Sequence, residues 1–410
     1  MSWERIPLRH ATVVLNRGTA PDYCEDGPVR MISQAANQGA GIDWNRTRFH
    51  AYDGDPRRLK GFLQPGDSFV NSTGTGTLGR VGWFSSGPDS RPCVADGHVT
   101  LVRFDPKHVH DRFGYFFLKS DSFQNFMFET LVFGSTNQIE LSRERMLGVP
   151  ICVPGVADQR AIVDFLDVET ARIDALVAKK YQLIRVLAEW EQSEMLEIAG
   201  DWRRCDTVSL RQFGTSVLTG PFGTQLAASE YISGGVPVIN PTHIKRGKIT
   251  PEEIVSVAAS AAARLSRHRL SAGDLVMGRK GDVGRTAIVD ARADGWLCGS
   301  DSIAIRPSPE RLIPAYLAMV MSIDIYRQQL MAKSTGATLA NVNESTLKDL
   351  RVPHRSVVSQ EECVRMAEHV NECYERLVSA LEQQISLLRE HRQALITAAV
   401  TGEMKVPGVS

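Results

Sequence analysis

Polar and basic side chains gather in two short, glycine-rich stretches of the sequence. The first is Asn71-Ser-Thr-Gly-Thr-Gly-Thr77, which Arg80 follows, and the second is Arg279-Lys-Gly-Asp-Val-Gly-Arg285. Glycine lets a backbone approach a phosphodiester closely, and Asn, Thr, Arg and Lys donate hydrogen bonds to phosphates and base edges. A run of charged residues is usually a solvated turn. Because similar polar and basic stretches occur in both places, we favour a surface that contacts a polyanion. The residues that we predict to make this contact are Asn71, Thr75, Thr77, Arg80, Lys245, Arg279, Lys280 and Arg285.

Sequence motifs of catalysis are incomplete in this chain. Gly74-Thr-Gly-Thr-Leu-Gly-Arg-Val81 resembles a phosphate-binding loop, but Arg and Val stand where the lysine and the magnesium-binding hydroxyl would be. Asn240-Pro-Thr-His243 lacks the second proline and the aromatic residue of the amino-methyltransferase motif. We therefore expect a chain that has no catalytic residues and holds neither a metal ion nor a cofactor.

The charges of the chain balance in total but not along its length. The 410 residues include 47 basic and 47 acidic ones, and a net charge of zero argues against an evenly basic nucleic-acid-binding protein. The net charge is +1 over residues 1–157, −4 over 158–206, +6 over 207–355 and −3 over 356–410. This alternation indicates that the first and third segments meet a polyanion and that the other two have a different role.

The second half of the chain repeats the order of the first at a spacing near 200 residues. Leu63-Gln-Pro-Gly-Asp67 matches Leu270-Ser-Ala-Gly-Asp274, and Val149-Pro150 matches Val352-Pro353. Other pairs in the same order are Trp3 with Trp202, Gly79-Arg80 with Gly284-Arg285, Asp96 with Asp301 and Tyr115 with Tyr316. Unrelated sequences would not keep so many similar pairs in one order, so we infer a tandem duplication.

Each half contains a globular part of mixed secondary structure. Runs rich in β-branched and aromatic residues, bounded by Gly, Pro and Asp, predict strands at 99–104, 274–277, 286–289 and 302–305. Apolar residues recur every three or four positions from Phe113 to Phe128 and from Pro314 to Met331, which predicts one helix in each half. The predicted fold class is α+β, with antiparallel or mixed sheets.

A long amphipathic helix follows each globular part. Neither Pro nor Gly interrupts residues 158–198, where Ile173, Leu176, Lys180, Leu183 and Leu187 recur at a three-four spacing. Residues 360–400 repeat this pattern, with Leu377 and Ile385 among the apolar positions, and Gly402 is placed to end the helix. A helix of about 40 residues is about 60 Å long and cannot hide its apolar stripe from water alone. We expect the two helices to pair antiparallel; the alternative is that each packs on its own domain.

Cysteine usage and hydropathy predict the compartment. Seven cysteines lie far apart without a CxxC motif, which indicates a reducing compartment, by default the cytoplasm. The most apolar stretch, residues 312–326, is short and contains Asp324, so a membrane span is disfavoured.

The repeated order of these features resembles the specificity subunit of type I restriction-modification systems. Each half shows Trp, Gly-Asp, Gly-x-x-Gly-Arg, Asp, a helix, Gly-(Ala/Ser)-Thr and Val-Pro before Gln and a long helix. Gln159-Arg-Ala-Ile162 with the following residues 165–174 is similar to the central spacer helix of that family. Residues 387–396 with Ala399-Val-Thr-Gly402 are similar to its C-terminal spacer. The resemblance covers essentially the full chain.

The resemblance implies two similar α/β target recognition domains, a tandem repeat joined and separated by two long antiparallel helices that form a coiled coil. The implied boundaries are 1–157 for recognition domain 1, 158–200 for the central spacer helix, 201–357 for recognition domain 2 and 358–410 for the C-terminal spacer helix. Each domain would read one half of a bipartite target in double-stranded DNA, and the helices would set the spacing. The implied partners are two methyltransferase subunits, which bring S-adenosylmethionine, and restriction subunits, which use ATP and magnesium.

Two other functions stay open at this point. A coiled-coil adaptor that recognises protein would show no salt-dependent affinity for DNA. A degenerate methyltransferase or nuclease fragment that acts alone would bind S-adenosylmethionine, although the chain lacks a glycine-rich cofactor loop.

Overall fold

The chain folds into two compact units. The computed structural model describes residues 3–38, 41–74, 76–133, 139–222, 225–245, 247–250, 252, 254–279, 284–332 and 342–409. Unit 1 consists of residues 1–180 and 382–410, and unit 2 consists of residues 181–381. The long helices α5 (Val156–Ala199) and α10 (Val357–Thr401) each contribute one part to unit 1 and the other part to unit 2. Unit 2 is therefore one continuous stretch of the sequence, whereas unit 1 combines the first part of the chain with its C-terminal residues.

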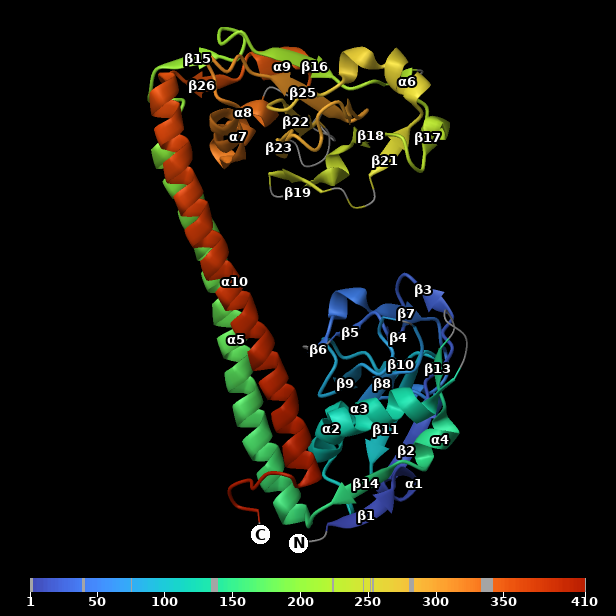
Figure 1. The fold of residues 1–410 in the computed structure, drawn as a ribbon. Helices are drawn as coiled ribbons and strands as arrows, with labels where there is room; N and C mark the ends of the chain where they lie inside the picture. Colours follow the sequence, from blue (N-terminus) through green and yellow to red (C-terminus); the bar gives the residue numbers. More distant parts are fainter. Residues whose placement is uncertain are drawn as a thin grey trace. The chain divides into compact units, whose positions relative to one another are not determined.

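Unit 1 contains two four-stranded sheets that share a core (Figure 1). The first sheet is antiparallel and has the order β2 (Thr12–Arg17), β11 (Val99–Phe104), β8 (Ser68–Asn71) and β9 (Val81–Trp83). The second has the order β10 (Cys93–Ala95), β4 (Val29–Ile32), β7 (Arg48–His50) and β3 (Tyr23–Cys24), with β10 parallel to β4. A separate pair joins β1 (Glu4–Pro7) to β14 (Pro150–Val153). Phe69 and Leu101 of the first sheet are buried in one cluster with Ile32 and Ala95 of the second.

Unit 2 repeats this topology strand for strand. Its antiparallel sheet has the order β16 (Ser216–Thr219), β25 (Ser302–Arg306), β22 (Leu275–Gly278) and β23 (Thr286–Ile288). The second sheet has the order β24 (Leu297–Cys298), β18 (Val236–Ile239), β21 (Val255–Val257) and β17 (Tyr231–Ile232), again with one parallel pair, β24 with β18. The terminal pair is β15 (Thr207–Ser209) with β26 (Arg351–Pro353). The inferred duplication and the α+β class are both confirmed, and the four strands predicted from residue patterns lie within two residues of β11, β22, β23 and β25.

The prediction of a single helix after each set of strands is wrong, because each is two helices. In unit 1 they are α2 (Asp111–Lys119) and α3 (Asp121–Phe126), separated by Ser120. The backbone of Ser120 is extended, and its hydroxyl accepts the N–H of Phe123, an N-cap that begins a new helix. In unit 2, α7 (Pro314–Ser322) and α8 (Asp324–Ala332) are separated by the extended residue Ile323. Apolar periodicity continues across both breaks, so it could not reveal them.

Shorter elements complete the two units. They are α1 (Leu8–Ala11), α4 (Arg143–Leu147), α6 (Ala259–Arg264), α9 (Glu344–Lys348), β5 (Asn37–Gln38), β6 (Gly41–Ile42), β12 (Val132–Phe133), β13 (Glu140–Leu141), β19 (Ile244–Lys245) and β20 (Lys248–Ile249). Short 3-10 helices lie at Trp44–Arg46, Pro56–Arg58, Ala228–Glu230, Pro241–His243 and Ser266–His268, and a π-helix at Met127–Leu131 directly follows α3. Within the described ranges of the chain, no helix is both long and apolar enough to span a bilayer.

The two long helices pair antiparallel within each unit, as predicted. In unit 1, Ile162 and Leu166 of α5 share a core cluster with Ile396 and Val400 of α10. Further along, Arg392 Nε lies 2.9 Å from Asp174 Oδ1. In unit 2, Met195 and Ile198 of α5 cluster with Cys363 and Ala367 of α10. In both units the residue numbers rise on one helix as they fall on the other.

The seam between the helices differs in part from the predicted one. Ile173 and Ile385 are buried, but Leu176, Leu183 and Leu377 are 41%, 46% and 45% exposed. A two-stranded coiled coil buries about two positions per heptad, so apolar residues beside the seam stay in water. The helices therefore carry more apolar surface than their mutual contact covers.

Candidate nucleic-acid interface

The two glycine-rich stretches found in the sequence occupy equivalent places in the two units. The first connects β8 to β9, and the second connects β22 to β23, the strands that correspond to them. Next to the edge strand of each sheet lies a short hairpin, β5–β6 beside β9 and β19–β20 beside β23. We call the described parts of this loop and hairpin the recognition edge, residues 37–42 with 71–80 in unit 1 and residues 244–249 with 279–285 in unit 2.

An arginine links loop to hairpin in each recognition edge. Arg80 Nη1 donates to the Asn37 carbonyl oxygen at 2.8 Å, and Arg285 Nη1 donates to the Ile244 carbonyl oxygen at 3.4 Å. Both arginines follow a glycine with positive φ, +79° at Gly79 and +89° at Gly284, a conformation that favours glycine. The Gly-Arg pairs that the repeat aligned in the sequence thus have the same structural role, which is to hold the two segments of the edge together.

Asn71 lies beneath the surface of unit 1 and supports the loop. Its side chain is 0% exposed, accepts a hydrogen bond from Asn37 Nδ2 at 2.8 Å and donates to the Gln34 carbonyl oxygen at 3.2 Å. A buried amide with these partners does not present its donors to a ligand, so the predicted direct contact by Asn71 does not fit its position. The sequence showed a polar residue type in a glycine-rich stretch, but burial is a tertiary property.

Thr77 and Arg80 lie on the partly exposed side of the same loop. Thr73 Oγ1 donates to Gln34 Oε1 at 3.2 Å and lies 3.0 Å from His98 Nδ1, so residues from three segments meet there. Sequence reasoning missed Gln34 and His98, since neither lies in a basic or glycine-rich stretch. Thr75 lies outside the described residues.

A buried carboxyl group holds the turn that carries His98. Asp96 is 3% exposed, and its Oδ1 accepts the backbone N–H of His98 at 2.8 Å while its Oδ2 accepts the Tyr23 hydroxyl at 3.2 Å. Burial raises the pKa of Asp96 above its usual range, and burial together with the nearby Asp96 raises the pKa of Tyr23 to about 12. Tyr23 therefore keeps its proton at neutral pH and remains a donor to the carboxyl group.

In unit 2 the recognition edge ends in two lysines. Lys245 and Lys248 are directly opposite each other across the hairpin, and both are exposed. Like charges in directly opposed positions repel each other, so a bound anion would stabilise this arrangement. Arg285 reaches the same hairpin through Ile244, and the backbone of Arg279 pairs with Asp301. The strand registers make Asp301 the counterpart of His98, so the pairing of Asp96 with Asp301 inferred from the sequence is wrong by two residues. Lys280 lies outside the described residues.

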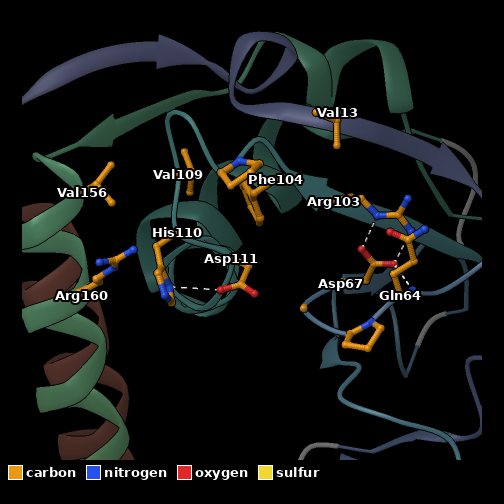
Figure 2. Close-up of a pocket in the computed structure, with 13 residues that line it drawn as sticks. Val13, Gln64, Asp67, Arg103, Phe104, Val109, His110, Asp111, Val156 and Arg160 are labelled. Carbon is orange, nitrogen blue, oxygen red and sulfur yellow. Dashed lines mark hydrogen bonds and ion pairs between the residues drawn. The ribbon is translucent and has the colours of Figure 1, made fainter.

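An open groove of about 330 Å³ lies at the other end of unit 1, where the domain meets the start of α5 (Figure 2). Its wall includes Val13, Val109 and Val156, and its charged groups are mostly paired with one another. Arg103 binds Asp67, and His110 Nδ1 lies 3.2 Å from Asp111 Oδ1. Of the predicted contact residues, the six that the structure describes do not line this groove. The groove is thus a feature of the junction between domain and helix rather than part of the recognition edge.

Comparison with known proteins gives one consistent picture. The family model described as the type I restriction modification DNA specificity domain matches residues 15–185. The chain is 19% identical over 341 residues to the specificity subunit of the type I restriction enzyme EcoBI of Escherichia coli, a match that covers 77% of this chain and 70% of that one. It is 26% identical over 177 residues to the StySPI specificity subunit of Salmonella potsdam, covering 41% of this chain and about a third, 36%, of that relative's length.

Two solved structures share the fold. A chain from a study of complex assembly and conformational transition of the type I R-M system has a TM-score of 0.75 at 15% identity, over 98% of both chains. The HsdS subunit of Thermoanaerobacter tengcongensis has a TM-score of 0.53 at 15% identity, over 98% of this chain and 97% of that one. At these identities the likeness concerns the fold.

Proposed function

The chain belongs to the specificity subunits of type I restriction-modification systems, and we propose that it reads DNA sequence for such a system without catalysing a reaction itself. Each unit is proposed to read one half of a bipartite target in double-stranded DNA. The observation that carries this proposal is the recurrence of the recognition edge, with an arginine-braced loop and hairpin at the same place in two units of the same topology.

The chemistry of the recognition edge suits groove readout. The major groove of B-DNA is about 12 Å wide and accepts a two-stranded ribbon, and Thr, Gln, Lys and Arg are residue types that read base edges or bind phosphates there. From the sequence prediction we retain Thr75, Thr77, Arg80, Lys245, Arg279, Lys280 and Arg285 as contacts. We add Gln34 and His98, which the fold brings next to Thr73, and we assign Asn71 a supporting role.

The long helices are proposed to set the spacing between the half-sites and to dock two methyltransferase subunits. Apolar residues beside the helix seam support docking, because surface that the helix pair leaves in water is suited to a protein partner. Examples are Val168 and Leu387 in unit 1, which are 65% and 57% exposed, and Val186 and Met366 in unit 2, which are 50% and 56% exposed. The net charges of −4 over residues 158–206 and −3 over 356–410 also suit a protein partner better than DNA.

The remaining partners follow from the same proposal. Restriction subunits would join the complex, S-adenosylmethionine would bind the methyltransferase subunits, and ATP with magnesium would bind the restriction subunits. The cytoplasmic location expected from cysteine usage stays a prediction; all seven cysteines are free thiols in the structure.

Mapping modified adenines in the genome of the host, with and without this gene, tests the proposed function. We expect the intact strain to modify a motif of two short sequences separated by a gap of fixed length and the deletion strain to lose that motif. A modification pattern that is the same in both strains would contradict the proposal. The adaptor alternative makes a different prediction, since the complex with its partner subunits would then show no salt-dependent affinity for DNA.

A further inference from the structure

A fully buried glutamine lies in the first turn of each long helix and joins the helix to the neighbouring globular domain. In unit 1 this residue is Gln159, which is 0% exposed. Its Nε2 donates to the carbonyl oxygens of Pro154 at 2.9 Å and His108 at 2.8 Å, and its Oε1 accepts the N–H of His110 at 2.7 Å. One side chain thus binds both the start of its own helix and the loop that leads from β11 to α2.

Gln360 makes the same three bonds in unit 2 and is also 0% exposed. Its Nε2 donates to the carbonyl oxygens of Arg355 at 3.0 Å and Arg311 at 2.8 Å, and its Oε1 accepts the N–H of Ile313 at 2.8 Å. The loop that it holds leads from β25 to α7, the counterparts of β11 and α2.

Glutamine suits this junction because one flexible side chain supplies two donors and an acceptor at its end. All six partners are backbone groups, so the contacts persist when the side chains of the loop vary. Glutamate would lose both donors and bring a charge into a buried place, and an apolar residue would leave three backbone groups without their partner. The hydrogen bonds therefore require this side chain specifically.

A groove opens beside the junction that each glutamine holds, next to apolar residues that pack the helix on its domain, such as Val109 with Ile162 in unit 1. The groove in Figure 2 is lined by His110 and Asp111, by Val156 and Arg160 of α5, and by further domain residues that include Arg103. In unit 2 a groove of about 220 Å³ is lined by Arg311, Arg355 and the start of α10 at Val357. Apolar packing holds the helix against the domain but has no preferred direction, whereas the hydrogen bonds of the glutamine favour one orientation of the helix relative to the domain.

A second hydrogen bond, to the other long helix, complements the glutamine in each unit. The N–H of Asp121 donates to Thr397 Oγ1 on α10 at 2.9 Å, and the N–H of Asp324 donates to Gln192 Oε1 on α5 at 2.9 Å. Each globular domain is thus attached to both helices of its unit at separate points. Attachment to two helices restricts rotation of the domain about either one.

We propose that Gln159 and Gln360 are positioning residues, which fix the angle between each recognition domain and its helix and so determine how strictly the chain requires one gap length between the half-sites. This inference rests on the proposed function. In this proposal neither glutamine contacts DNA, because both side chains are fully buried in the protein. A domain released from its glutamine keeps its recognition edge but can tilt, and it therefore tolerates a half-site that is displaced by a base pair.

The test uses the full chain assembled with the methyltransferase subunits of its own system. The probes are duplexes that carry the mapped bipartite target with the native gap and with gaps one base pair shorter or longer. The variants are Gln159→Met, which keeps the length of the side chain and removes its donors and acceptor, and Gln159→Glu, which keeps the acceptor only. Met146→Ala serves as a control, because Met146 is fully buried in the apolar core of unit 1 and belongs to α4. This control lowers the stability of unit 1 without touching the junction.

The quantity compared is the affinity for the duplex with the native gap divided by the affinity for a duplex with an altered gap. We expect this ratio to be the same in wild type and Met146→Ala and to be roughly tenfold lower in Gln159→Met. Preference for the two half-sites should be unchanged in all variants. If Gln159→Met keeps the wild-type ratio while its melting temperature falls as in Met146→Ala, the glutamine is only structural and the inference is wrong. If Gln159→Met does not fold, the same comparison of gap discrimination and melting temperature is made with Gln159→Glu. A wild-type complex that shows no bipartite preference would instead overturn the proposed function, which separates the two failures.

Discussion

Arg103 holds the buried carboxylate of Asp67 with two parallel hydrogen bonds, from Nε to Oδ1 and from Nη2 to Oδ2, each 2.7 Å long. Asp67 also accepts the N–H of Gln64, so the pair ties the turn before β8 to the neighbouring central strand β11 (Figure 2). Unit 2 repeats the relationship, with Arg306 Nε 3.0 Å from Asp274 Oδ2. The two Gly-Asp turns that identified the repeat in the sequence thus owe their similarity to one shared ion pair in each domain.

Replacing Asp67 by Asn should destabilise unit 1 strongly, because the partly buried guanidinium of Arg103 then loses its charged partner. Asp67 is 1% exposed, and breaking a buried pair costs about 3 kcal/mol. Thermal unfolding followed by circular dichroism should show a transition lowered by several degrees. The exposed pair of Asp290 with Arg292 is the control, and Asp290→Asn should leave the transition unchanged. Equal effects of the two substitutions would contradict the assigned importance of the Asp67 pair.

Replacing Asp96 by Asn should stabilise unit 1 at neutral pH and have little effect near pH 4. Burial raises the pKa of Asp96 in the folded chain, so its contribution to stability is fully present below the unfolded pKa, about 3.9, and is lost as the pH rises through the folded pKa. Asparagine keeps an oxygen acceptor for the N–H of His98 and never ionises. Hydrogen-exchange protection of β10 and β11 at pH 4 and pH 7 measures the difference.

An aspartate of opposite behaviour provides the control for this experiment. The Arg30 guanidinium donates a hydrogen bond to Asp89 and lowers the pKa of that carboxyl group, so its contribution is present above the unfolded pKa and is lost as the pH falls. Asp89→Asn should therefore not raise protection at pH 7. If Asp96→Asn lowers hydrogen-exchange protection at pH 7, ionised Asp96 stabilises the fold, and the predicted direction of the change in stability is wrong.

Alanine at Gly402 or Gly200 should destabilise the end of the preceding long helix. Both glycines have positive φ, +78° and +90°, just past the last residues of α10 and α5, and a left-handed alanine costs about 1 kcal/mol. At Gly402 a Cβ would also lie 3.1 Å from the ring of Trp3, so the larger effect is expected there. Gly148, with a φ of −86°, is the matched site at which alanine should be neutral. Chemical denaturation that ranks Gly148→Ala as the most harmful change would refute this order.

Reversing the charge of Lys245 should weaken binding to every DNA sequence and lower the dependence of affinity on salt. Each lost phosphate contact reduces the slope of log K against log salt by about 1. The same outcome is predicted for Lys280→Glu. Titration of fluorescent duplexes over a range of salt concentrations measures the slope, and Lys179→Glu, on the exposed side of α5, is the control that should keep it. An unchanged slope in both test variants would place these lysines away from DNA.

Lengthening both long helices should change the gap in the DNA target but neither half-site. One helical turn inserted after Lys180 and one after Leu381, where the two units divide, adds about 5.4 Å to each helix. At about 3.4 Å per base pair, the preferred gap should lengthen by one or two base pairs. Sequencing of the modified sites reports both properties at once. A change in half-site sequence would show that the helices take part in base reading.

Residue patterns alone determined most of the architecture of this protein. Apolar periodicity predicted the long helices, and runs of β-branched and aromatic residues predicted four strands. The aligned order of pairs such as Leu63–Asp67 with Leu270–Asp274 predicted two similar domains. The helices and strands could be predicted because they depend on local residue patterns. The two domains could be predicted because the duplication left the same local pattern in both halves of the sequence. The break at Ser120 was missed because a capping serine does not interrupt apolar spacing.

Only the tertiary structure decided which polar residues face outward and which hold the fold together. Asn71 and Thr77 lie in one glycine-rich stretch and have similar chemistry, yet the amide is enclosed by Asn37 and Gln34 while the hydroxyl lies at the partly exposed rim. Gln159 likewise stands in a polar stretch that gives no sign of full burial. The burial of a side chain and its hydrogen-bond partners depend on segments that are tens to hundreds of residues away in the sequence. A local residue pattern therefore cannot predict them.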